Sequence, residues 1–442
     1  MLKTINDLLW GPGTLALLLG SSLFLTLRMR FLPWRRLGYA LRNALGKTAR
    51  TASNGGVSPF SALMTTLAAT MGTGNIVGVA TALVAGGPGA LIWMELSALL
   101  GMATVFAESV LSVKYRRKGL ESRWTGGPMY VMEAAFGQRA GRTMGRLFAL
   151  FAVGASFGIG GMTQSNAITE ALGNTFALSA GPVGIATALL SLLAISGGIR
   201  SISKITSVLV PLMSVFYMGA GIAVILGHTD NLIPGLSLIL QSALSPQSIA
   251  GGIAGNALRW GIARGVFSNE AGLGSAGIAA ASADTSSPVR QGYISMTGPF
   301  FDTIVVCTVT GLAICCSGVL GVTDGAGNPV NGAALTILAF ETVLGPFGAR
   351  FIAVSIVLFA FSTILGWEYQ GEQAFSYLTQ GRGRAAYRLL YALAALWGAE
   401  LRLDTVYLFS DLCNALMCFP NLICVLWMSG EVVRDMRRYE AR

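Results

Sequence analysis

The stretch Ala68-Ala69-Thr70-Met71-Gly72-Thr73-Gly74-Asn75 lies in the middle of an apolar run from Phe60 to Val84, which is long enough to cross a lipid bilayer. Two glycines that flank a threonine, followed at once by Asn75, disfavour a continuous helix at this point. In hydrocarbon, an unwound backbone is tolerated only where it is buried in protein or lines a cavity. The sequence therefore predicts a broken membrane helix, whose free carbonyl and N–H groups suit a small zwitterion together with a cation.

The composition indicates an all-α polytopic membrane protein. Of the 442 residues, 53% are hydrophobic and 11% are charged, and the mean hydropathy is +0.64. Soluble proteins carry about 25% charged residues. The 57 glycines are typical of membrane helices that pack closely or are interrupted. We expect one transmembrane domain over residues 1–442. The six cysteines lie in apolar runs and predict packing roles, and the single histidine, His228, is expected at the surface.

Eleven spans can be drawn along the chain. An initial helix at about 8–27 has neither the basic n-region nor the small-residue cleavage site of a signal peptide, so we expect it to be retained. The other ten spans are predicted at about 58–84, 90–113, 146–172, 184–199, 205–226, 249–283, 293–320, 350–373, 385–399 and 407–429, followed by a tail at 430–442.

The placement of lysine and arginine gives the predicted orientation. If the N-terminus lies outside, the inside segments collect 25 of the 30 basic residues. Lys3, Arg350 and Arg402 lie outside, and the last two, Arg259 and Arg264, lie within a span. This strong bias agrees with the positive-inside rule and with an odd number of spans. The net charge of +10 is therefore interpreted as a cytoplasmic-face signature, and no nucleic-acid partner is expected.

A second interruption is predicted at 265–275, within the run from Ile249 to Ala283. When the first helix is left out, the two breaks fall in the first and sixth of ten core spans. These spans are the matching members of two five-helix halves, 58–228 and 249–429. Because five is odd, the halves enter the membrane from opposite sides. Paired interrupted helices in inverted repeats point to the central binding site of a transporter.

Several long motifs resemble the alanine or glycine:cation symporter family, and the resemblance covers essentially the whole chain. The segments that carry it are Leu67-Ala68-Ala69-Thr70-Met71-Gly72-Thr73-Gly74-Asn75-Ile76-Val77-Gly78-Val79-Ala80, Gly86-Gly87-Pro88-Gly89-Ala90, Ala107-Glu108, Lys114-Tyr115-Arg116, Gly126-Gly127-Pro128-Met129-Tyr130, Phe267-Ser268-Asn269-Glu270-Ala271-Gly272-Leu273-Gly274-Ser275 and Phe361-Ser362-Thr363-Ile364-Leu365-Gly366-Trp367-Glu368-Tyr369. Met71 stands where valine is commoner in the family. The resemblance implies the leucine-transporter fold, with ten core helices and one extra N-terminal helix. It also implies sodium-coupled uptake of alanine or glycine, with proton coupling in some members.

The resemblance also implies a sodium site between the first and eighth core helices. Its expected ligands are the carbonyls of Ala68 and Met71, a carbonyl near Phe359 or Ala360, and the hydroxyls of Ser362 and Thr363. A hydroxyl pair in a membrane helix can instead bond back to the preceding turn. A second sodium position would involve Asn75.

The expected substrate site uses both breaks. The substrate carboxylate should meet the N–H groups near Gly72, Thr73 and Gly74 at the start of the second half-helix. The ammonium needs acceptors, and the candidate groups are the carbonyls of Ala69, Thr70, Phe267 and Ser268. Gln164 is placed at the pocket by the resemblance, although an ordinary interhelical hydrogen bond is an equal alternative. Trp367, one turn beyond Thr363, is expected to limit the substrate to a small side chain.

Carboxylates within predicted spans are functional candidates by default. The sequence has seven of them: Glu95, Glu108, Glu170, Glu270, Asp302, Glu368 and Glu372. We expect Glu270 to pair with Arg264 as a structural cap of the second break, rather than to carry protons. We expect Glu108 to pair near the basic cytoplasmic loop.

Other functional classes are weaker. An enzyme lacks support because the sequence has no His-Glu-x-x-His motif and one histidine in all. A receptor would need a soluble signalling domain, and a passive channel would need a continuous pore without an ion site. Secondary transport is therefore the predicted class, and the resemblance implies a sodium symporter in a bacterial cytoplasmic membrane, with an uncoupled or proton-coupled carrier as the alternative. The expected partners are the amino acid and the lipid bilayer, and no obligatory protein partner is evident.

Overall fold

The computed structural model describes the whole chain except residues 1–8, 53–55, 120–123, 245–254, 402–403 and 442. In the described part, the helices are accompanied by one two-strand hairpin, in which β1 (Arg117–Lys118) pairs antiparallel with β2 (Trp124–Thr125). Among the described residues, six helical stretches are long and apolar enough to cross a membrane: Ala90–Lys114, Pro128–Phe176, Ile199–Gly227, Pro288–Ser317, Phe347–Thr379 and Val406–Glu440. The polytopic class is thus confirmed, while the count of eleven spans stays a prediction.

The first half of the chain contains the first interrupted helix. The helices before it are α2 (Pro12–Arg28), α3 (Leu32–Arg35), α4 (Leu37–Leu45) and η1 (Lys47–Ala49). The interrupted helix consists of α5 (Pro59–Thr70), η2 (Thr73–Asn75) and α6 (Val77–Gly86). The elements after it are α7 (Ala90–Lys114), α8 (Pro128–Phe136), η4 (Gly137–Gly141), α9 (Arg142–Ala155), η5 (Ser156–Met162), α10 (Thr163–Phe176), α11 (Ala180–Ser196), α12 (Ile199–Gly227) and α13 (Thr229–Leu244).

The second half again begins with an interrupted helix, made of α15 (Gly255–Asn269) and α16 (Ser275–Ala281). The remaining elements are α17 (Pro288–Ser295), α18 (Thr297–Pro299), η7 (Phe300–Cys307), α19 (Thr308–Ser317), α20 (Gly332–Leu344), α21 (Phe347–Thr379), α22 (Arg384–Gly398) and α23 (Asp404–Glu440). The stretch 430–440, which belongs to the predicted tail, continues α23 as helix.

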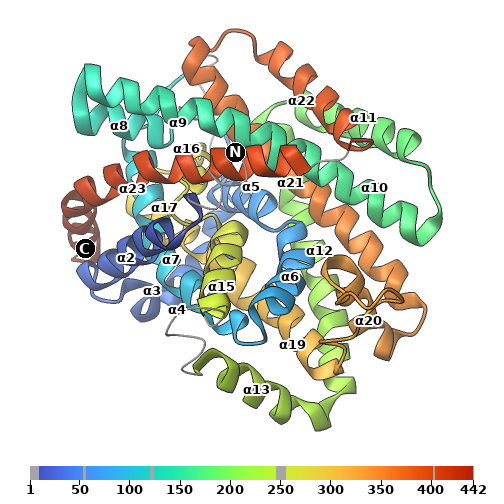
Figure 1. Ribbon diagram of the computed structural model, residues 1–442. Coiled ribbons are helices and arrows are strands. Elements are labelled where there is room, and N and C mark those ends of the chain that lie inside the picture. Colours follow the sequence, from blue (N-terminus) through green and yellow to red (C-terminus); the bar gives the residue numbers. More distant parts are fainter. Residues whose placement is uncertain (1–8, 53–55, 120–123, 245–254, 402–403, 442) are drawn as a thin grey trace.

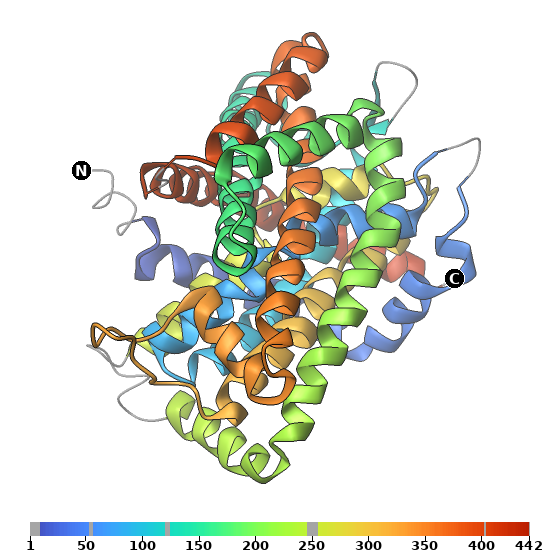
Figure 2. The same cartoon turned by 90° about the vertical axis from the view of Figure 1, so that its right-hand side faces the viewer.

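Both interrupted helices lie in the interior of the molecule. α5 packs against α12, α16 and α21, and α15 packs against α6 and α7 (Figure 1). α12 is the long helix that runs beside α21 and leads into α13 in Figure 2. Every residue of α5 except Ser61 is buried. Unwound backbone at the end of α5 is therefore enclosed by protein, as the bilayer requires.

The two breaks differ in where they begin. α5 ends at Thr70, inside the stretch 68–75 where the sequence predicts a break. The second break is shorter than predicted, because residues 265–269 continue α15 and only 270–274 are non-helical. At this break Glu270 adopts φ +55 and Gly272 and Gly274 adopt φ +95 and +83, values in or near the left-handed region that ends a helix.

Arg116 binds the C-terminal end of α16. Its guanidinium donates to the carbonyl oxygens of Ala281 at 3.1 Å, Ala283 at 2.5 Å and Thr285 at 2.7 Å. It also lies over the Trp124 ring, 4.1 Å from the centroid. Burial lowers the pKa of Arg116 to about 10, so the side chain stays charged at neutral pH. A cation on the last carbonyls of a helix stabilises its C-terminal end.

Candidate functional site

At the first break, backbone carbonyl and N–H groups on both sides lack the hydrogen bonds of a continuous helix. Met71 leaves helical geometry at φ −73 and ψ 84, and the N–H of Gly72 donates to Asn75 Oδ1 at 3.0 Å. The carbonyls of Ala69 and Thr70 accept no hydrogen bond from the described part of the chain, and the amides of Thr73 and Gly74 donate none to it. These orphan acceptors and donors lie within a few residues of each other, where a zwitterion needs both kinds.

Five oxygens expected to hold sodium converge between α5 and α21. Ser362 Oγ lies 3.4 Å from the carbonyl oxygen of Ala68, 3.3 Å from that of Met71 and 2.8 Å from that of Phe359. Thr363 Oγ1 lies 3.5 Å from the Met71 oxygen and 3.1 Å from the Phe359 oxygen. All five residues are buried. The hydroxyls here bond back to their own helix and also face the broken one, and the sodium site itself stays a prediction.

Two glycines allow α5 and α21 to approach this closely. A Cβ atom on Gly366 would lie 2.4 Å from the backbone nitrogen of Ala69. A Cβ atom on Gly72 would lie 2.5 Å from Thr363 Oγ1. Small residues at helix contacts let backbones come together in membranes. The separation of the oxygen cluster is thus set by the absence of side chains at positions 72 and 366.

The two breaks face each other across Gly74. A Cβ atom there would lie 3.7 Å from Phe267 Cδ1 and 3.9 Å from the Cα of Ser268. On a third side, Thr73 Oγ1 donates to Gln164 Oε1 at 3.3 Å. Gln164 Nε2 in turn donates to the carbonyl of Ile159 in η5, a π-helical segment, at 3.1 Å. The structure therefore brings Thr73, Gly74, Gln164, Phe267 and Ser268 to one place.

Trp367 closes the same region from α21. It is 1% exposed, and a Cβ atom on Gly160 of η5 would lie 2.3 Å from the Trp367 Cβ. The carboxylate of Glu270 interacts with its side chain. The indole is therefore buried next to η5 and the second break, and it is not a lipid-facing anchor.

Asp302 is a member of this site that sequence reasoning did not single out. Its Oδ1 accepts a hydrogen bond from Asn75 Nδ2 at 2.9 Å, and its Oδ2 accepts from Ser268 Oγ at 2.8 Å and from Thr303 Oγ1 at 2.7 Å. The residue is fully buried. Asn75 lies in the first break and Ser268 lies near the end of α15, just before the second break, so the carboxylate ties both to η7. The sequence feature that could have identified Asp302 as a site residue is that it is the only charged residue between Tyr293 and Leu320.

Both the oxygen and the nitrogen of the Asn75 side-chain amide form hydrogen bonds here. Its amide nitrogen also lies 2.9 Å from the Asp302 carbonyl oxygen and 3.3 Å from Ser268 Oγ, while its oxygen accepts the Gly72 N–H. The side chain therefore holds the first break in shape. The second sodium position at Asn75 stays a prediction, with Asp302 as an adjacent carboxylate.

The expected ion pair between Glu270 and Arg264 is wrong. Glu270 Oε2 accepts a hydrogen bond from Ser275 Oγ at 2.5 Å. Arg264 lies over the rings of Trp260 and Phe267, and the carboxylate that it interacts with is that of Asp411. Because α15 continues to Asn269, Arg264 lies more than one helical turn before the break, and the turn at Glu270 directs the carboxylate elsewhere.

The expected pairing of Glu108 with the basic loop is also wrong. Glu108 is 2% exposed, and its Oε1 accepts from Asn421 Nδ2 at 2.6 Å. The same amide donates to the carbonyl of Gly272 at 2.9 Å. Glu108 therefore faces the second break from α7. Among the described residues, neither Glu108 nor Glu270 forms an ion pair.

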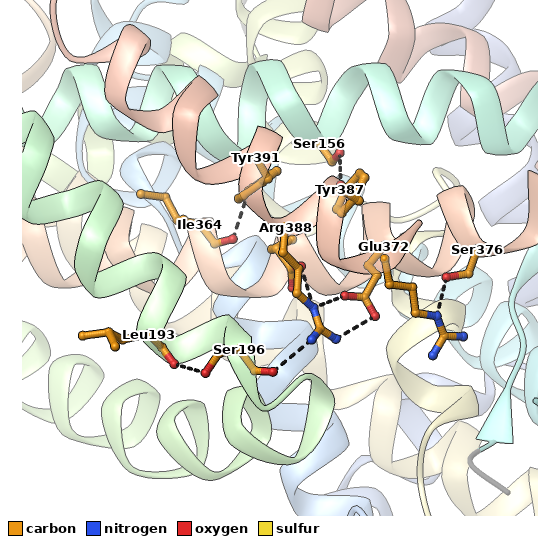
Figure 3. A network of polar contacts seen from close by, with 11 residues as sticks. Ser156, Leu193, Ser196, Ile364, Glu372, Ser376, Tyr387, Arg388 and Tyr391 are labelled. Atoms are coloured by element: carbon orange, nitrogen blue, oxygen red, sulfur yellow. Dashed lines mark hydrogen bonds and ion pairs between the residues drawn. The ribbon is translucent and has the colours of Figure 1, made fainter. Parts of the chain in front are cut away.

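Of the other carboxylates in predicted spans, Glu372 and Glu368 lie near Arg388, and Glu170 is exposed. Figure 3 shows that Arg388 of α22 donates to both oxygens of Glu372, at 2.5 and 3.1 Å, and to the Ser196 carbonyl at 2.9 Å. Glu368 lies 3.9 Å from the same guanidinium. Nearby, Tyr387 bonds Ser156 and Tyr391 bonds the Ile364 carbonyl, so α22 is tied to α21 and η5 (Figure 3). Glu170 is exposed on α10.

Comparison with known proteins places this geometry in a family of transporters. The family model described as the sodium:alanine symporter family matches residues 1–442. A relative from Methanococcus maripaludis, named sodium/alanine symporter AgcS, is 44% identical over 99% of this chain and 96% of its own length. A Bacillus subtilis relative named probable sodium/glutamine symporter GlnT is 36% identical over 98% of this chain and 89% of its own length. Another from the same organism, named putative sodium/proton-dependent alanine carrier protein YrbD, is 32% identical over 99% of this chain and 91% of its own length.

Solved structures of two transporters share the fold. MhsT in complex with L-phenylalanine aligns with a TM-score of 0.61 at 15% identity, over 85% of this chain and 91% of that chain. Mhp1, a nucleobase-cation-symport-1 family transporter, aligns with a TM-score of 0.52 at 12% identity, over 90% of this chain and 96% of that chain. Both belong to the leucine-transporter type of fold that the family resemblance implies. On the match over its full length, the chain belongs to the sodium:alanine symporter family.

Proposed function

We propose that this protein is a sodium-coupled symporter that imports small neutral amino acids, alanine or glycine, by alternating access. The observation that carries the proposal is the cluster of five neutral oxygens from Ala68, Met71, Phe359, Ser362 and Thr363. Oxygen ligands without a formal charge suit a monovalent ion that must both bind and leave. The family assignment and the relative named sodium/alanine symporter support the same ion.

The substrate would bind between the two breaks. Its carboxylate would meet the unpaired amides of Thr73 and Gly74, where the positive end of a helix favours an anion. Its ammonium would meet the free carbonyls of Ala69 and Thr70 and those of Phe267 and Ser268. Gln164, fixed by its bond to Ile159, would contact the substrate from α10. Because the substrate contacts residues adjacent to the ion ligands, occupation of one site would favour occupation of the other.

Uptake into proteoliposomes tests this proposal. An inward sodium gradient should concentrate labelled alanine above its outside level, while equal sodium on both sides should only equilibrate it. Ser362→Ala should raise the sodium concentration that gives half-maximal uptake by about tenfold, because one of five ligands is lost. Ser355→Ala is the matched control, since this serine lies two turns earlier on α21 and its hydroxyl donates only to the Phe351 carbonyl. The proposal fails if uptake is independent of the sodium gradient. It also fails if both variants raise the sodium concentration for half-maximal uptake equally.

Proton coupling is a second candidate, favoured by one observation. Glu108 and Glu270 are both buried at the second break, and each is held by a neutral side chain, Asn421 and Ser275. Ionised carboxylates are costly to bury without a cation, so a proton would stabilise this arrangement. One relative is named a sodium/proton-dependent alanine carrier.

Substitution of Glu270 separates the two modes of coupling. If Glu270 carries the proton, Glu270→Gln should abolish the pH dependence of uptake and leave its sodium dependence intact. Glu170→Gln, at an exposed position on α10, should leave both unchanged. A pH profile that is the same in Glu270→Gln and in the unmodified protein would exclude Glu270 as the proton carrier. Loss of sodium dependence in Glu270→Gln would instead show that the carboxylate supports the ion site.

A further inference from the structure

A basic cavity lies away from the transport site, between the β1–β2 hairpin, α8, α9 and the start of α22. Its volume is about 590 Å³, within the range of about 300–1,000 Å³ found for small-molecule sites. Five cationic side chains line it, namely Arg117, Lys118, Arg142, Arg146 and Arg384. Glu133 is the one carboxylate among its described lining residues.

The Glu133 carboxylate already has partners within the protein. Glu133 Oε2 lies 2.9 Å from Arg117 Nη2, and its Oε1 accepts from the Tyr377 hydroxyl at 2.7 Å and lies 3.7 Å from Arg142 Nε. Arg146 and Lys118 form no ion pair with any residue in the described part of the chain. The cavity therefore keeps an excess of positive charge, which attracts an anion with several acceptor oxygens.

One side of the cavity continues onto the lipid-facing surface. Arg142, Arg146 and Leu150 are spaced four residues apart on α9, so they lie along one face of the helix. Leu150 is 57% exposed and Leu147 is 47% exposed. Exposed leucines on a membrane helix contact acyl chains. The same helix thus offers a cationic headgroup contact and, one turn further along, an apolar surface.

We propose that this cavity binds the phosphate headgroup of an anionic phospholipid, whose acyl chains lie along Leu147 and Leu150. Arg142 and Arg146 would donate charge-assisted hydrogen bonds to the phosphate oxygens. Lys118, Arg117 and Arg384 would add positive charge around it. The charge bias along the chain assigns this basic side to the cytoplasm, where the inner leaflet carries anionic lipids. Free phosphate shares the headgroup chemistry but would gain nothing from the leucines.

Thermal unfolding of the purified full-length protein tests the proposal. The protein in detergent is titrated with phosphatidylglycerol, with phosphatidylcholine or with inorganic phosphate. Phosphatidylglycerol should raise the Tm of the unmodified protein, and phosphatidylcholine and phosphate should not. In the variant Arg142→Gln with Arg146→Gln, the apparent affinity for phosphatidylglycerol should fall about tenfold or more, because two charge-assisted contacts are lost.

A control pair matches the charge and spacing of the test pair. Arg200→Gln with Lys204→Gln removes two exposed cations four residues apart on α12, outside this cavity, and should keep the lipid response. The single variant Arg146→Gln removes no ion pair and gives the answer if the double variant does not fold. Equal phosphatidylglycerol affinity in pocket and control variants would overturn the proposal. So would equal protection by phosphatidylcholine, or by phosphate alone.

Discussion

At the scale of single residues, the ion site depends on side chains that are absent. Gly72 and Gly366 leave room for Thr363 and for the Ala69 backbone, at distances of 2.5 and 2.4 Å from a Cβ atom that neither glycine has. Gly72 itself has φ −126, which any residue adopts. The requirement for glycine at position 72 is therefore steric contact with Thr363 and not backbone strain.

Trp367 is the residue that we expect to set substrate size. Trp367→Ala removes an indole packed against Gly160, and the space released should admit larger side chains. One methylene in a pocket is worth about 1–3 kcal/mol, so competition of alanine uptake by valine or leucine should strengthen about tenfold or more. Competition assays in proteoliposomes measure this. Trp397→Ala, at a tryptophan that is 60% exposed on α22, is the control. Unchanged competition in Trp367→Ala would show that another side chain limits the pocket.

At the scale of elements, side chains of α22 hold α21 in position, and we call these contacts a brace. α21 is the helix that carries Ser362, Thr363 and Trp367. The contacts of Arg388, Tyr387 and Tyr391 join α22 to α21, α11 and η5 (Figure 3). The π-helical segment η5 also supports this region. Its Gly160 contacts Trp367, and the carbonyl oxygen of its Ile159 accepts a hydrogen bond from Gln164. Irregular turns inside helices are frequent at functional sites, and here the irregularity positions two pocket residues.

Loss of Arg388 should destabilise this brace. Arg388→Gln leaves Glu372, 5% exposed in its side chain, and Glu368 without their cation. Removing one partner of a buried pair costs about 3–5 kcal/mol, so the Tm should fall clearly. Arg36→Gln breaks the pair of Arg36 with Glu440, whose side chains are 46% and 20% exposed, and should cost about 1 kcal/mol or less. Thermal unfolding of both variants in one detergent compares them. Equal losses would mean that the Arg388 pair does not hold α22 in place.

At the scale of the whole molecule, the distribution of charge predicts the orientation in the membrane. The basic segments fall on one side of the predicted spans, which places the C-terminus inside and the loop after α19 outside. All six cysteines are buried and free, so they should react slowly with a membrane-impermeant thiol reagent. The chain thus permits labelling at introduced cysteines with little background.

Labelling of intact cells tests the orientation. Gly325→Cys, at an exposed loop position where a Cβ atom meets nothing within 4 Å, should react with an impermeant maleimide. Ala441→Cys, exposed just after the end of α23, should react only after the cells are opened. The opposite pattern would invert the predicted topology. Labelling of both positions from outside would be incompatible with the odd number of spans predicted between them, at about 350–373, 385–399 and 407–429.

Local features of the sequence were sufficient for much of this description. A Gly-Thr-Gly-Asn stretch inside an apolar run predicts a break, because glycine lowers helix propensity where no neighbour can restore it, and α5 does end at Thr70. The membrane class follows from composition in the same direct way. The family motifs then placed Ser362 and Thr363 opposite Ala68 and Met71, and these oxygens do come together.

The partners of the buried carboxylates were decided only by tertiary structure. Glu108 meets Asn421 across 313 positions of sequence, and Asp302 meets Asn75 across 227. Arg264 is six residues from Glu270, but the helix between them and the left-handed turn at Glu270 separate the two charges. A sequence determines where a backbone can break, because that depends on a few adjacent residues. Which groups face each other in a low-dielectric interior depends on how distant helices pack, and no local pattern contains that information.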